Sequence, residues 1–231
     1  MADPHVFAAE GIERIRVSTL SGSVAVLAEA RADIVVEKGG AGAKASAGTL
    51  TVTSHSGPVV IRCPEHSNIV VGTASGGISL RGRLGEVAAS SPSGGIRIEH
   101  ATSADVRGGS GTVQVDRAEG RCRLAIKSGR ATIGSAGELS GASISGQVVA
   151  TVTGPVSVRT VSGNVDASAA GEGDVEVETL SGSVTVRLPH GVRPRARLRS
   201  RSGRSRCDCP QGDDLEVAIQ SLSGRIVVTG Q

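Results

Sequence analysis

One dipeptide, Ser-Gly, recurs at a nearly constant interval along the chain of 231 residues. The stretch TLSGSVAV at 19–26 returns almost unchanged as TLSGSVTV at 179–186, and eleven Ser-Gly pairs fall into one frame. Successive glycines of this frame are separated by 17 to 21 residues, except for one gap of 35. A short fixed period is the signature of a repeat architecture, in which each unit packs on its neighbours. We therefore expect a stack of similar units.

Each repeat shows the alternation of apolar and polar residues that is typical of strands with one buried face. In one repeat the inward positions are Val175 and Val177 before the Ser-Gly pair, and Val184 and Val186 after it. The unit is thus a strand, a corner, a second strand and a loop, and equivalent residues of stacked units lie about 4.8 Å apart. The gap of 35 residues predicts one degenerate rung around ADIVVEKGG at 32–40.

These features predict an all-β fold, a single-stranded parallel β-solenoid (β-helix) with about 11 to 12 rungs. A right-handed coil is expected, because crossovers between parallel strands have that hand. Residues 1–14 are predicted to form an N-terminal cap segment, in which Phe7 is the only phenylalanine, and residues 15–231 the repeat domain. The narrow interior of such a coil also explains the absence of Tyr and Trp.

The two ends of the predicted stack are unequal. Only three residues follow Val228, the last inward residue, so the final rung is expected to expose its backbone edge. Because open edges recruit other strands, a homodimer or an end-to-end assembly through the C-terminal rung is predicted.

The first residues lack the basic start and apolar run of a secretory signal, and no stretch resembles a transmembrane segment, so a cytoplasmic location is expected. An extracellular location stays open if the sequence is a piece of a longer chain.

The most basic segment runs from Arg187 to Arg206 and holds eight arginines and no acidic residue. It suggests either a nucleic-acid contact through phosphates or a ladder of ion pairs between rungs. The repeat frame favours the ladder, because it places the arginine strand between two strands that carry carboxylates. Nucleic acid is not the expected partner, since the chain has almost no aromatic side chains on which bases could stack.

The predicted ladder comprises Glu172, Asp174, Glu176 and Glu178 on one side, Arg193, Arg195, Arg197 and Arg199 in the middle, and Asp214 and Glu216 on the other side. Arginines that this frame leaves without partners are the candidates for contact with an anionic partner, namely Arg201, Arg204, Arg206 and Arg225.

No catalytic, metal or cofactor site is predicted. A catalytic serine needs a base and an oriented partner, and no corner serine differs from its copies. A glycosidase needs one protonated and one ionised carboxyl group. The acidic strand from Glu172 to Glu178 is the place for such a pair, but neighbouring arginines would keep its carboxylates ionised. Cys207 and Cys209 form C-x-C without a second pair, so all four cysteines are expected as thiols, with Cys122 and Cys207 facing inward.

The SGxVxV repeats, from IRVSTLSGSVAV at 15–26 to SLSGRIVV at 221–228, resemble the bacterial β-strand-repeat family known as putative adhesins, a domain of unknown function. That resemblance implies a non-enzymatic scaffold or interaction module with a flat repeated surface for a protein or glycan partner. The period is also similar to that of bactofilin-type β-solenoids, which implies a self-assembling structural element as the alternative. A carbohydrate-active enzyme is the third hypothesis.

Overall fold

A computed structural model describes residues 4–171 and 173–230. They fall into two compact units, Met1–Glu119 (unit 1) and Gly120–Gln231 (unit 2), and each unit is described by itself. The described residues are mostly in β-strands, with one short 3-10 helix at Gly40–Gly42. None of the described helical segments has the length and apolar character needed to cross a membrane.

Unit 1 contains the strands β1 (His5–Ala8), β2 (Arg14–Ser21), β3 (Val24–Glu29), β4 (Asp33–Lys38), β5 (Ala43–Ser46), β6 (Thr49–Ser56), β7 (Val59–Pro64), β8 (Asn68–Thr73), β9 (Ile78–Ser91), β10 (Ile96–Gly108) and the start of β11 (Thr112–Val152). Most neighbours pair in parallel and in register, as the repeat frame predicts. For example, Ile15 lies beside Leu50 in one rung and beside Ile69 in another. The parallel β-solenoid fold is thereby confirmed.

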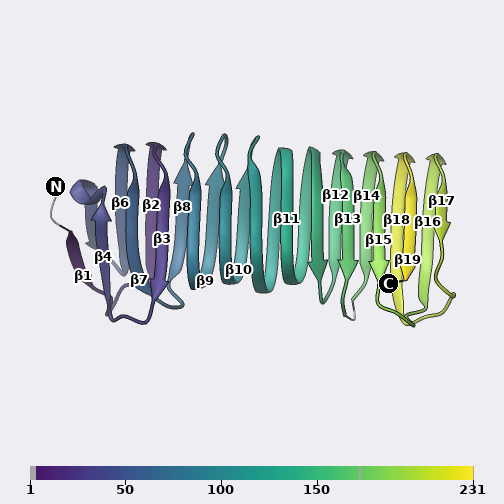
Figure 1. Ribbon diagram of the computed structural model, residues 1–231, viewed down its shortest axis with the longest axis horizontal. Helices are drawn as coiled ribbons and strands as arrows, with labels where there is room; N and C mark the ends of the chain where they lie inside the picture. The colour runs from purple at the N-terminus through teal and green to yellow at the C-terminus, as the bar shows by residue number, and fades with distance from the viewer. Residues whose placement is uncertain (1–3, 172, 231) are drawn as a thin grey trace. The chain divides into compact units, whose positions relative to one another are not determined.

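The rungs of unit 1 do not follow the order of the sequence. The rung formed by β2 and β3 lies between the rung of β6 and β7 and the rung that begins with β8 (Figure 1). The first repeat of the chain is therefore an interior rung, and its residues Ile15, Val17, Val24 and Val26 are at most 1% exposed.

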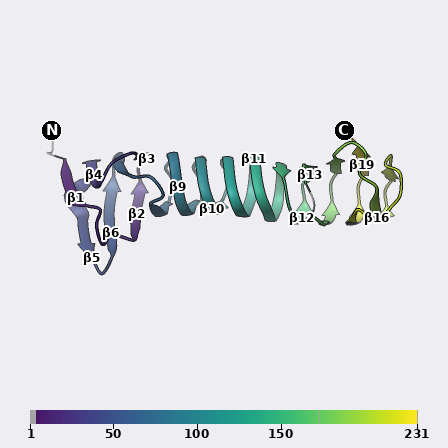
Figure 2. The same ribbon diagram turned by 90° about the horizontal axis from the view of Figure 1, so that it is seen from below.

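Antiparallel strands cover the end of unit 1. Strand β4 pairs antiparallel with β7, β1 pairs antiparallel with β4, and β5 runs antiparallel to β6 (Figure 2). The degenerate rung expected at 32–40 thus exists, but its strand runs against its neighbour. Arg62 holds it in place, with its guanidinium 2.6 Å from Glu37 and 2.9 Å from Glu29. Phe7 is half-buried opposite Ile34.

Unit 2 contains the rest of β11, followed by β12 (Val156–Ser162), β13 (Asn164–Ala169), β14 (Val175–Ser181), β15 (Val184–Leu188), β16 (Pro194–Ser202), β17 (Ser205–Cys207), β18 (Leu215–Ser223) and β19 (Ile226–Gly230). Here too the terminal repeat is inserted. Strand β18 lies between β14 and β16, and β19 lies between β15 and β17 (Figure 1). The prediction that the C-terminal rung ends the stack is therefore wrong, because the rung of β16 and β17 lies outside it.

Corner glycines of neighbouring rungs pack directly against one another, and their contacts follow the same order of rungs. A Cβ atom added to Gly182 would lie 2.0 Å from the carbonyl oxygen of Gly163, and one added to Gly224 would lie 2.0 Å from that of Gly182. One added to Gly203 would lie 1.9 Å from the oxygen of Gly224. Only glycine fits where consecutive corners approach so closely. Gly182 and Gly224 also have positive φ angles, 141° and 150°, which disfavour other residues.

The interior consists of the aliphatic residues that the period-two pattern places inward. Val113, Val115, Val158, Val165 and Val184 are each at most 2% exposed, as predicted. Such burial is the main stabilising contribution in a stack whose rungs cannot bury an apolar face alone.

Candidate interaction surface

The arginines of β16, and Arg193 just before it, form ion pairs with the rung beside them. Arg197 lies 2.9 Å from Glu216, and Arg193 lies 3.5 Å from Asp214. Asp214 also accepts a hydrogen bond from the Arg193 backbone N–H, and the two bonds from Arg193 lower the pKa of Asp214 below its ordinary value. Asp213, which is not part of the predicted ladder, lies 2.8 Å from Arg195.

The predicted ladder with carboxylates on both sides is wrong, because β18 separates the acidic strand from the arginines. Glu176 lies beside Ala218, and Ala218 lies beside Arg197. Glu178 pairs with Arg159 at 2.8 Å instead. Asp174 accepts a hydrogen bond from the Glu216 backbone N–H. Glu172 lies outside the described residues, and Arg199 has no ion pair within the described ranges.

Strands β16 and β17 form the edge of unit 2. Of the strands that the structure describes, only β18 lies in register with β16, and only β19 with β17. The inward residues Ala196 and Leu198 are half-buried, whereas Val217 and Ile219 in the neighbouring rung are fully buried. The end of the apolar interior is thus partly open to solvent at this edge.

Three of the four predicted anion-contact arginines come together at the corner of the last two rungs. Arg204 and Arg225 occupy equivalent positions, and the Arg204 carbonyl accepts a hydrogen bond from Ile226 N–H. Arg201 occupies the position equivalent to Leu222. None of the three has an ion pair among the residues that the structure describes, whereas Arg206 pairs with Asp208.

A row of exposed aliphatic side chains, which was not predicted from the sequence, follows the same corner. We name as the aliphatic ridge the four residues before corner serines in adjacent rungs, Ile144, Val161, Leu180 and Leu222. Their exposed fractions are 53%, 47%, 53% and 50%. The signal was present in the repeat frame, since an apolar residue at an outward position recurs in these four repeats.

The described residues offer no metal site. They contain no group of three or more His, Cys, Asp or Glu side chains that could hold a metal ion. In unit 1 an open hollow is lined by Glu13, Glu65 and His66, among others. His100 lies 2.8 Å from Glu119, and their hydrogen bond lowers the pKa of that carboxyl group.

The cysteines are buried or half-buried and are not joined by disulfides in the described part of the chain. Cys122 is buried, as predicted, and Cys207 is half-buried because its rung is the end rung. Burial raises the pKa of the Cys63 thiol to about 11. At neutral pH this side chain is therefore a neutral packing group and not a thiolate nucleophile.

The parallel rungs and the exposed row along their corner define a β-solenoid repeat module with a surface suited to interaction. The chain belongs to the Toastrack DUF4097 family, and the model of that family matches residues 8–224. That family is a domain of unknown function, and the match confirms the β-strand-repeat family suggested by the SGxVxV motif.

Among curated proteins, none matches the chain. The chain is similar to a putative cell adhesion protein from Clostridium sporogenes, with 9% identity and a TM-score of 0.24 over 99% of each chain. A TM-score this low does not establish that the two structures share a fold.

Proposed function

We propose that this chain is a non-enzymatic repeat scaffold that presents its solenoid surface to a protein or glycan partner. The unpaired edge of β16 and β17 is the observation that supports a protein, because an edge strand offers a row of backbone N–H and C=O groups to an added strand. The half-buried Leu198 and Ala196 add apolar surface that such a strand would cover.

The chemistry of the partner strand follows from the side chains of β16. Its outward positions carry Arg195, Arg197, Arg199 and Arg201, and its inward positions carry small or aliphatic residues. A strand that alternates acidic and aliphatic residues would place carboxylates beside the arginines and cover the interior. The pair Arg159 and Glu178, which are opposite in β12 and β14, shows that this neighbour relation forms an ion pair in this fold.

A synthetic peptide with the sequence of residues 174–182, DVEVETLSG, has this alternation. In the folded protein, Glu178 occupies the same position in β14 as Arg199 does in β16. We expect the fluorescently labelled peptide to bind the protein in an anisotropy titration, and the peptide with Glu178→Lys to bind more weakly. The protein variant Arg199→Glu should reverse this preference, because it exchanges the charge at the same position. Absent binding, or equal binding of both peptides, would contradict the proposal.

Self-assembly is the second candidate function, because the same edge can accept a second copy of the chain. Two β16 strands that meet antiparallel would place arginines near arginines, and like charges on facing strands are destabilising. We therefore expect light scattering over a series of protein concentrations to give a constant mass. A mass that rises to that of a dimer, and that Arg199→Glu changes, would favour assembly through this edge instead.

A further inference from the structure

The corner of unit 2 carries a second surface, which shares only Arg201 with the β16 edge. The aliphatic ridge runs across four neighbouring rungs in the order Ile144, Val161, Leu180, Leu222. Equivalent residues of stacked rungs lie about 4.8 Å apart, so the four side chains form a straight row about 14 Å long. The corner residues beside the ridge are small or polar, because serine and glycine follow each aliphatic side chain. The ridge therefore stands out from the corner.

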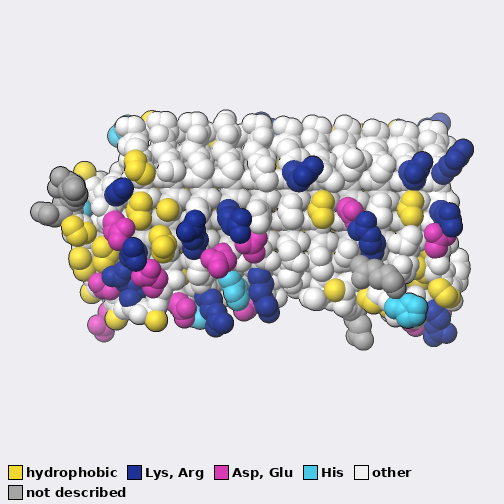
Figure 3. Space-filling view, viewed as in Figure 1, with side chains coloured by type: hydrophobic (Ala, Val, Ile, Leu, Met, Phe, Trp, Pro, Cys, Tyr) yellow, Lys and Arg dark blue, Asp and Glu magenta, His cyan; other side chains and the backbone are white. Residues whose placement is uncertain are grey.

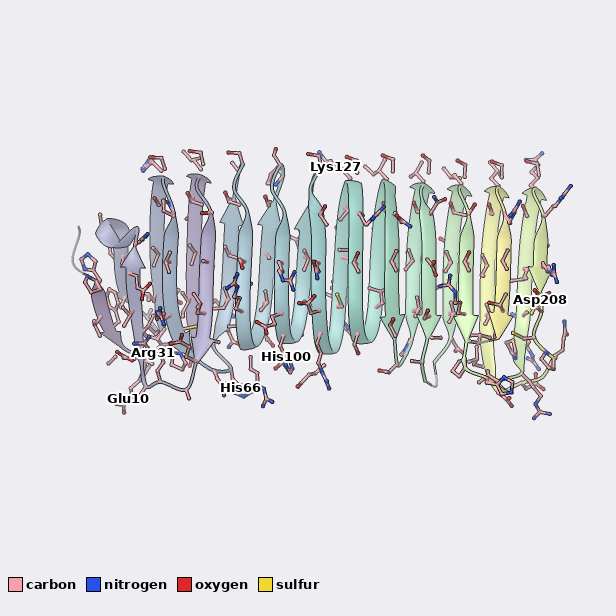
Figure 4. All side chains as sticks on the ribbon, in the orientation of Figure 1. Glu10, Arg31, His66, His100, Lys127 and Asp208 are labelled. Atoms are coloured by element: carbon pink, nitrogen blue, oxygen red, sulfur yellow. The ribbon has the colours of Figure 1, made fainter. Side chains whose placement is uncertain are left out.

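Basic side chains flank this row. Lys127 occupies the equivalent position in the repeat before Ile144, and Arg201 the position after Leu222. Just past the corner glycines stand Arg130, Arg204 and Arg225, all exposed. Figure 4 shows Lys127 at the edge where the corner side chains project, and Figure 3 shows basic and no acidic side chains along the upper margin over unit 2.

Two carboxylates in the strands that lead to and from the corner are already paired with other arginines. Glu178, two residues before Leu180, pairs with Arg159 at 2.8 Å. On the other side of the corner Asp166 pairs with Arg187. The corner from residue 127 to residue 225 thus combines exposed aliphatic side chains with five basic side chains that have no ion pair among the described residues.

The charge at both ends of the ridge argues against a second copy as the occupant. Two ridges brought together in either direction would place a basic end against a basic end, which is unfavourable. A straight, protruding row does not enclose a small ligand either, because ligand sites are concave. A flat anionic surface with an apolar layer beneath it matches both the shape and the charge of the corner.

We propose that the corner of unit 2 binds the surface of a bilayer that contains anionic phospholipids. The ridge side chains enter the boundary between headgroups and acyl chains, where apolar side chains of interfacial proteins lie. Lys127, Arg201 and Arg225 remain at headgroup depth, because long basic side chains keep their charge in the polar layer. Neither the ridge alone nor the charge alone suffices for stable attachment.

Sedimentation with vesicles tests the proposal. The purified chain is mixed with vesicles of phosphatidylcholine alone and with vesicles in which about one third of the lipid is phosphatidylserine. We expect binding to the second kind and a marked loss of binding at 0.5 M salt, because screening weakens attraction to the anionic surface. The double variant Leu180→Ser/Leu222→Ser should weaken binding at least about tenfold. The double variant Arg204→Ala/Arg225→Ala should weaken it about 25-fold, since each basic residue near such a surface contributes about fivefold.

Leu20 provides the matched control. It precedes a corner serine in the same TLSG sequence and is 59% exposed, but it belongs to unit 1 and its neighbours at this position are His55 and Ala74. Leu20→Ser should leave vesicle binding unchanged. Circular dichroism melting of all variants checks that the fold is kept.

Several outcomes would overturn the proposal. It fails if the chain binds neither kind of vesicle, or binds both kinds equally. Binding that survives the ridge variant would assign the interaction to charge elsewhere on the chain. A ridge-dependent dimer without vesicle binding would identify the occupant as a second copy. A ridge-dependent complex with a purified acidic protein, again without vesicle binding, would identify a protein instead.

Discussion

Replacing Leu198 and Ile219 separately by alanine tests the order of the last two rungs. Both residues occupy equivalent inward positions, Leu198 in β16 and Ile219 in β18, and they lie side by side. If the rungs followed the sequence, Ile219 would be in the end rung and Leu198 in an interior rung. In the structure the relation is reversed, because Ile219 is 0% exposed and Leu198 is half-buried.

The expected losses of stability differ accordingly. Ile219→Ala removes about three methylene equivalents from a closed interior, worth about 0.8 kcal/mol each, and leaves a cavity, so the free energy of unfolding should fall by about 3 to 4 kcal/mol. Leu198→Ala removes a side chain that already contacts water, and no closed cavity results. Its loss should be about 1 kcal/mol. The difference between the variants is then about 2 to 3 kcal/mol.

Urea unfolding followed by circular dichroism measures this difference, provided that the two variants share the same m value. Val158→Ala is a suitable reference, because Val158 is 0% exposed in an interior rung under either order. Equal losses for Leu198→Ala and Ile219→Ala would refute the inserted rung. A larger loss for Leu198→Ala would show that the rungs follow the sequence.

Three further predictions concern the interior, the surface and the thiols. Val158→Asp places an unpaired carboxylate in the stack and should cost several kcal/mol, so an unchanged melting temperature would contradict the inward frame. Arg197→Glu places a second negative charge beside Glu216. The variant should lower the melting temperature at low salt, and lower it less at 0.5 M salt. An effect that is independent of salt would contradict an exposed ion pair. Cys63, with its pKa raised to about 11 by burial, should resist a thiol reagent at pH 8 until urea unfolds the chain, whereas the half-buried Cys207 should react in the native state. Rapid native labelling of Cys63 in a peptide map would overturn that assignment.

The local sequence pattern was sufficient to predict the shape of each rung and the residues of its interior. The Ser-Gly frame predicted the corners, and period-two alternation predicted buried residues such as Val158 and Val184, because the direction of a side chain in a strand depends only on its position parity. The same frame left Arg201, Arg204, Arg206 and Arg225 without carboxylate partners, and this was wrong for Arg206, which pairs with Asp208. It did not reveal the aliphatic ridge, because each exposed residue looks unremarkable until its neighbours in adjacent rungs are known.

The order of the rungs was decided by tertiary structure alone. Near-identical repeats have nearly the same local preferences, so the sequence does not say which repeat stacks on which, apart from the longer spacing of 21 residues in the last two repeats. Packing determines this order. The last repeat carries Leu215, Val217 and Ile219, and burial of these side chains between two neighbouring rungs stabilises the fold. The arginines of β16 stay hydrated when their strand lies at the edge. The sequence by itself therefore determined the shape of each rung, while long-range packing determined which rung is at the edge and which side chains meet there.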